Sequence, residues 1–133
     1  MKVQVLLTDQ VNENIDNYDE NRNLFEANQF EAKKNQMFYM SNLNSTGETT
    51  TLIVGTDGCE SDYDFVYLGA SIGKKINNDC DLKLNAIAEN LNMYLIELGI
   101  ILSMYRFENF KSQKTQEMNI NILDSEFSSE IEN

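Results

Sequence analysis

Residues 69–75 (Gly-Ala-Ser-Ile-Gly-Lys-Lys) combine glycines and lysines in a way that could bind phosphate. A Walker A loop has four residues between its glycines, and a Ser or Thr after its lysine holds magnesium. Here three residues separate Gly69 from Gly73, and Lys75 occupies the Ser/Thr position. The segment also continues a helical apolar pattern, so we interpret both glycines as positions where a helix packs closely.

A second candidate is the apolar run at residues 52–58, which ends in the turn Gly55-Thr56-Asp57-Gly58. In open α/β sheets, ligands bind beyond the carboxyl ends of the strands, so this turn has the most site-like backbone in the chain. A plain tight turn is the alternative. The acidic residues at 57–64 lack the order of Asp, Gly and Glu found in a calcium loop, and we interpret them as a solvated turn that caps the next helix.

Residue types that are missing exclude several mechanisms. The 133-residue chain has no His and two Cys, which rules out Ser-His-Asp, Cys-His and imidazole metal sites. Cys59 and Cys80 are too far apart for a redox motif, and we expect free thiols in a cytoplasmic protein. A net charge of −12 disfavours binding to nucleic acid or to an anionic membrane.

The hydrophobic pattern predicts strands that alternate with helices, and therefore an α/β domain with a mixed sheet flanked by helices. We expect one domain at residues 1–123, with an acidic, Asn-rich loop at 8–23, followed by an acidic tail or linker at 124–133. The predicted strands are 2–7, 36–40, 49–54, 82–86 and 118–123, and the predicted helices are 24–32, 65–76 and 89–104.

The predicted helix at 89–104 carries two apolar stripes. The first consists of Leu91, Leu95, Leu98 and Leu102, and the second of Met93, Ile96 and Ile100. One helix cannot turn both sides to a single sheet. We expect the leucines to face the sheet, because they form the longer and better-spaced stripe. The second stripe is then the candidate interface for a second subunit or another domain.

Three segments, in this order and spacing, resemble the leucyl (cytosol) aminopeptidase family. Residues 98–112 resemble its GxxLxxYRFDxYKT segment, through Tyr105, Arg106, Phe107 and Lys111. Residues 52–58 are similar to its LLVGLG strand and turn. Residues 30–34 resemble its FxGK stretch, with Ala32 in place of the glycine. The resemblance covers residues 25–123. Asp57 interrupts the glycine turn, and the loop at 8–23 stands where the family has another strand and helix.

This resemblance implies the family's N-terminal domain, a macro-domain-like α/β sandwich without catalytic residues. The family's two divalent metals, zinc or manganese, belong to its catalytic domain, so we expect no metal, cofactor or activity in this chain alone. The implied role is assembly or regulation of a leucyl aminopeptidase-like metallopeptidase, through self-association, contact with the catalytic domain, or both. The alternative is a stand-alone macro-like module that binds a nucleotide, such as ADP-ribose, or a protein partner.

Overall fold

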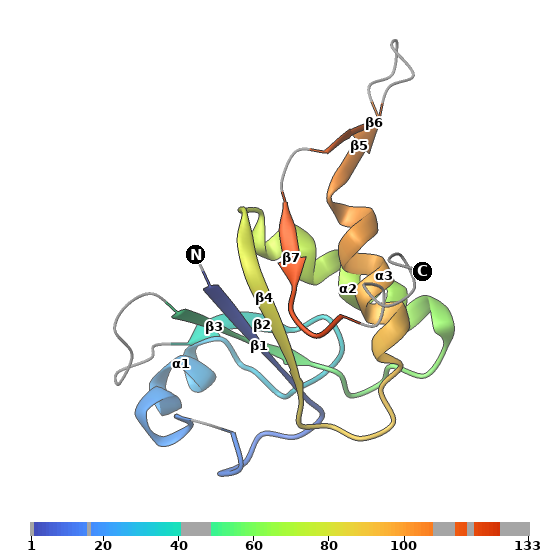
Figure 1. Cartoon of the computed structure of the whole chain (residues 1–133). Coiled ribbons are helices and arrows are strands. Elements are labelled where there is room, and N and C mark those ends of the chain that lie inside the picture. Colours follow the sequence, from blue (N-terminus) through green and yellow to red (C-terminus); the bar gives the residue numbers. More distant parts are fainter. Residues whose placement is uncertain (1, 16, 41–48, 108–113, 117–118, 126–133) are drawn as a thin grey trace. The chain divides into compact units, whose positions relative to one another are not determined.

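The computed structural model describes residues 2–15, 17–40, 49–107, 114–116 and 119–125 (Figure 1). The described chain forms an α/β fold, and its largest sheet has the strand order β2-β3-β1-β4-β7. Two compact units can be distinguished. Unit 1 comprises Met1–Cys59 and Leu82–Leu91, and unit 2 comprises Glu60–Asp81 and Asn92–Asn133.

Unit 1 is built on three strands that confirm the predicted mixed sheet. Strand β1 (Lys2–Thr8) runs parallel to β3 (Thr49–Gly55), and β2 (Met37–Met40) runs antiparallel to β3. The predicted hairpin strands at 36–40 and 49–54 therefore pair as expected. Beside β1, the backbone oxygen of Leu7 accepts hydrogen bonds from the two residues that follow β4 (Cys80–Ala86).

An aromatic cluster forms much of the unit 1 core. Phe25 of helix α1 (Arg22–Ala27) makes edge-to-face contacts with Phe30 and with Phe38, at centroid distances of 5.6 and 5.0 Å. Buried Ile15 joins this cluster, and Val11 and Tyr18 pack against it. The acidic segment at 8–23 is therefore a loop, as predicted, that its three apolar residues anchor to the core. It ends in a 3₁₀ turn, Asp19–Asn21.

In unit 2, helix α2 (Asp62–Ile76) ends where the sequence indicates and has a cap at each end. The side chains of Ser61 and Asp64 form a reciprocal capping box with the backbone of the first turn. Asn77, with φ of 47°, ends the helix in a left-handed conformation that asparagine tolerates well. This capping box sets the start of α2 at Asp62, three residues before the predicted helix at 65–76, so Asp64 caps the helix from within its first turn.

Helix α3 (Met93–Ser103) starts later than predicted, because Asn92 caps it by accepting a hydrogen bond from the backbone of Leu95. It crosses α2 at glycines. A Cβ atom on Gly69 would overlap the carbonyl oxygen of Ile96, and one on Gly99 would overlap the carbonyl oxygen of Val66. The interpretation of the α2 glycines as close-packing positions is confirmed.

The chain continues through three short strands in unit 2. Strand β5 (Tyr105–Phe107) pairs antiparallel with β6 (Lys114–Gln116). Strand β7 (Ile120–Ile122) falls inside the predicted last strand. Next to it, Asn119 donates its backbone N–H to Asp79 and accepts a hydrogen bond from the backbone of Cys80. No described helix is both long enough and apolar enough to cross a membrane.

Candidate functional site

The turn after β3 is the segment that the sequence indicated as the best candidate for a ligand-binding turn. Three of its N–H groups, those of Gly55, Thr56 and Asp57, donate to backbone oxygens within unit 1, and the N–H of Cys59, which follows it, donates to Thr56. A phosphate loop needs such N–H groups to point at its ligand. Because these donors are already used by the chain itself, the turn has the hydrogen bonding of a tight structural turn, which was the alternative interpretation.

Two of the three family-like segments meet at this turn. Asp57 donates its N–H to the oxygen of Ala32 (2.9 Å) and accepts a hydrogen bond from the N–H of Lys34 (2.8 Å). Gly55 has no room for a side chain, because a Cβ atom there would overlap the backbone of Ala32 and Lys33. The segments at 30–34 and 52–58 are thus parts of one corner, and the glycine serves chain packing.

Ala32 occupies a backbone conformation that favours glycine. Its φ of 62° is left-handed, and Gln29 and Asn35, three residues to either side, are also left-handed. Such a conformation costs a residue with a Cβ about 1 kcal/mol or more. A glycine, which the resemblance implies at this position, would adopt this conformation without that cost.

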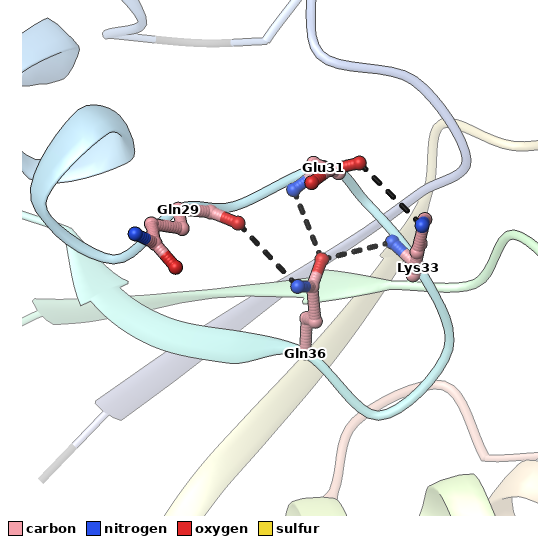
Figure 2. Close-up of polar contacts among 4 residues, drawn as sticks. All are labelled: Gln29, Glu31, Lys33 and Gln36. Atoms are coloured by element: carbon pink, nitrogen blue, oxygen red, sulfur yellow. Dashed lines mark hydrogen bonds and ion pairs between the residues drawn. The ribbon is translucent and has the colours of Figure 1, made fainter.

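The side chain of Gln36 holds this irregular loop in place (Figure 2). Its oxygen accepts hydrogen bonds from the backbone of Glu31 (2.9 Å) and Lys33 (3.1 Å), and its nitrogen donates to the oxygen of Gln29 (3.4 Å). An exposed ion pair joins Lys33 to Glu31 at 3.5 Å. These four residues share their polar groups with one another, so the cluster is a structural clamp that no motif in the sequence indicated.

Thr56 carries a buried hydroxyl without a hydrogen-bond partner in the structure, at the carboxyl end of β3. Thr8, the last residue of β1, is also a buried threonine. Its hydroxyl donates to the oxygen of Gln10 at 2.7 Å and accepts from the Gln10 N–H at 3.2 Å. An unpaired buried hydroxyl destabilises the folded chain, whereas a paired one is close to neutral or favourable.

The two threonines give a matched test by substitution with valine. We expect Thr56→Val to leave the free energy of unfolding unchanged or to raise it by up to about 1 kcal/mol, since no hydrogen bond is lost. We expect Thr8→Val to lower it by about 1 kcal/mol. Urea denaturation followed by circular dichroism measures both. An equal loss in the two variants would show that the Thr56 hydroxyl has a partner, such as a buried water.

An open depression of about 590 Å³ lies on the acidic loop of unit 1. It is lined by Asn12, Glu13, Asn14, Tyr18 and Arg22. The guanidinium of Arg22 lies 5.7 Å from the centre of the Tyr18 ring and is paired with Asp19 at 3.0 Å. The side-chain oxygen of Asn12 accepts a hydrogen bond from the N–H of Asn14. These polar groups serve the loop itself, and the depression is shallow.

The two cysteines are free thiols in the structure, as predicted. Cys59 is half-buried, and Cys80, at the start of β4, is buried. Burial raises the pKa of the Cys80 thiol above its usual value, and the neighbouring carboxylates of Asp81 and Asp79 raise it further. A raised pKa lowers the thiolate fraction, so Cys80 is a poor nucleophile. Among the described residues, no group of three or more Cys, Asp and Glu is placed to hold a metal ion.

The burial of α3 contradicts the predicted roles of its two stripes. Ile96 and Ile100 of the candidate interface are fully buried, and Met93 is half-buried. Leu98 is half-buried instead of being core, and Leu102 is 56% exposed. Around α3, Gly99 lies between the two stripes, at the point where the backbones of α2 and α3 approach most closely. Because they are buried, Ile96 and Ile100 are not available to a partner.

The same helix also buries a carboxylate that no motif in the sequence indicated. Glu97 is 4% exposed, and its Oε2 accepts a hydrogen bond from the hydroxyl of Ser125 at 3.0 Å. Buried carboxylates are retained where hydrogen bonds satisfy them. This contact joins the start of the acidic tail to α3.

The third family-like segment differs from its expected structure. The predicted helix at 89–104 begins upstream of this family-like segment, and α3 ends at Ser103, after which Tyr105–Phe107 form strand β5, which was not predicted. The pairing of β5 with β6 places Arg106 opposite Thr115. Lys111, the fourth residue of this motif, lies outside the described residues.

Comparison with solved structures identifies relatives of this fold. A mutant of tomato leucine aminopeptidase matches with a TM-score of 0.61 and 13% identity, over 98% of this chain and 32% of that one. The bottromycin maturation enzyme in complex with Mn matches with a TM-score of 0.64 and 15% identity, over 98% of this chain and 28% of that one. This chain thus spans about a third of the length of either protein. No protein-family model matches the sequence, and no curated protein matches it significantly.

Proposed function

We propose that this chain is a non-catalytic assembly or regulatory domain of a leucyl aminopeptidase-like metallopeptidase. The observation that carries the proposal is the fold, which almost the whole chain shares with about a third of a leucine aminopeptidase. The contact between residues 30–34 and 52–58 supports it, because two of the family-like segments then form one corner of unit 1.

In this proposal the chemistry belongs to another domain, which holds the metals. The described residues of this chain supply exposed surface for contacts. The partner is a second copy of the chain, an aminopeptidase catalytic domain, or both. Either contact would control how the catalytic domains are arranged and how substrates reach them.

The alternative proposal is a macro-like module that binds a nucleotide or ADP-ribose at the turn 55–58. The hydrogen bonding of that turn argues against it, since the N–H groups of Gly55, Thr56 and Asp57 are bonded to backbone oxygens and do not face a ligand. The tight approach of Gly55 to Ala32 and Lys33 leaves no space there for a ligand.

Two measurements on the purified chain test these proposals. We expect no hydrolysis of leucine p-nitroanilide with manganese or zinc, together with a molecular mass in sedimentation above that of the 15.3 kDa monomer, alone or mixed with a leucyl aminopeptidase catalytic domain. A chain that stays monomeric in both experiments contradicts the assembly role. Saturable binding of ADP-ribose in calorimetry, abolished by Thr56→Val or by Gly58→Ala, would favour the macro-like module instead.

A further inference from the structure

The outer face of α2 exposes two tyrosines that the core does not explain. Tyr63 and Tyr67 are 71% and 48% exposed, and their rings stack with centroids 5.9 Å apart. Residues four positions apart lie on the same side of a helix, so the pair forms one aromatic surface. It lies opposite the buried row of Phe65, Leu68, Ile72 and Ile76. Tyrosine is enriched at protein interfaces because its ring is apolar and its hydroxyl is polar.

Charges of opposite sign lie at the two ends of this aromatic surface. Exposed Glu60 precedes the cap of α2, and exposed Asp62 is its first residue. Exposed Lys74 lies near the last turn, eleven residues after Tyr63 and therefore on nearly the same side of the helix. The face thus runs from acidic, through aromatic, to basic over about 20 Å.

A surface with this order of charges is complementary to itself when one copy is reversed. In an antiparallel pair of α2 helices related by a two-fold axis at the level of Leu68, Lys74 of one copy meets the Glu60 end of the other. The same register places Lys74 over the Tyr63 ring of the second copy, a favourable cation–π geometry. Tyr67 then faces small Ala70 of the second copy. Every contact occurs twice, because a two-fold interface uses the same patch on both subunits.

We propose that the outer face of α2 (Glu60, Tyr63, Tyr67, Ala70 and Lys74) binds the same face of a second copy of this chain, antiparallel. Charge complementarity between the two ends of this face favours a second copy of the chain as the partner. Each copy carries a net charge of −12, so a second copy is repelled except where a basic group meets an acidic one. The α2 face supplies that match at both of its ends. This inference rests on the proposed assembly role and names the surface that performs it.

Complementary charge reversal tests this interface. The variants are Glu60→Lys and Lys74→Glu, and Lys83→Glu is a control at an exposed lysine of a different element, β4. Sedimentation at about 10 µM to 1 mM chain and about 0.15 M salt reports the mass, because salt then screens the long-range repulsion. We expect the wild type and Lys83→Glu to approach twice the monomer mass, and each α2 variant alone to associate at least about tenfold more weakly.

Mixing the two charge-reversed variants tests whether the residues at positions 60 and 74 meet across the interface. An equimolar mixture of Glu60→Lys and Lys74→Glu should regain association, since each variant now offers the opposite charge to the other. Tyr67→Ala should weaken association in every combination. Unchanged association of the single variants, or no recovery in the mixture, overturns this interface while leaving assembly by another surface intact. A monomeric wild-type chain that nevertheless binds a catalytic domain also overturns the self-association, whereas one that binds neither partner overturns the proposed function as well.

Discussion

Replacing Ile100 with glutamate should unfold unit 2, whereas the same change at Leu102 should be tolerated. Ile100 is fully buried, and Leu102 is 56% exposed two positions later on the same helix. Burying an unpaired carboxylate costs several kcal/mol, so we expect Ile100→Glu to lower the free energy of unfolding by at least about 4 kcal/mol. Leu102→Glu should change it by no more than about 0.5 kcal/mol.

Urea denaturation monitored by far-ultraviolet circular dichroism measures this difference. Ile96→Glu serves as a second buried test, and Leu98→Glu, at a half-buried position, should fall between the extremes. The prediction opposes the interpretation from the sequence, in which the isoleucines formed an interface and the leucines formed the core. A folded Ile100→Glu chain that has lost only self-association would restore that earlier interpretation.

The sequence predicted α3 as a helix but could not orient it, because both of its stripes are apolar. A pattern orients a helix only when one side is polar. Gly99 indicates a close helix crossing, because a glycine in the middle of a helix weakens it unless close packing compensates. It lies between the two stripes, however, so its position does not decide which stripe is buried.

The five strands of the larger sheet were predicted from their apolar runs, whereas β5 and β6 were not predicted. The run at 49–54 and its closing glycine became β3, and the run at 2–7 became β1. The corner between residues 30–34 and 52–58 could not be predicted from periodicity. It depends on left-handed backbone at Ala32 and on the three hydrogen bonds of the Gln36 side chain, and neither follows from local sequence preferences.

The candidate site, like the fold, was predicted only where local sequence patterns determine the structure. No strand was predicted for the motif Tyr105-Arg106-Phe107, although aromatic residues favour strands, and it pairs with β6. The turn at 55–58 was correctly placed after a buried strand, but its use depended on where each N–H points. Only the tertiary contacts with Ala32, Gln36 and Thr8 settle that its donors serve the fold.

We expect a second large effect when alanine replaces Gly69. The sign of the change in the free energy of unfolding distinguishes helix propensity from close helix packing. In an isolated helix, alanine is more favourable than glycine by about 1 kcal/mol. In this fold, the new Cβ atom would overlap the carbonyl oxygen of Ile96 and approach the backbone nitrogen of Ile100 at 3.0 Å. Because backbone cannot rotate away, the helices must separate. We expect the free energy of unfolding to fall by about 3 kcal/mol, measured by urea denaturation.

Gly73, one turn further along α2, provides the matched control. A Cβ atom there would meet the side chain of Ser103, and the nearest backbone atom, the oxygen of Ile100, would be 3.5 Å away. Gly73→Ala should therefore cost less than Gly69→Ala, and removing the serine side chain with Ser103→Gly should recover part of that loss. No side-chain removal on α3 should rescue Gly69→Ala, since its obstacle is backbone. If Gly69→Ala instead stabilised the chain by about 1 kcal/mol, helix propensity alone would govern the position and the close crossing of α2 and α3 would be wrong.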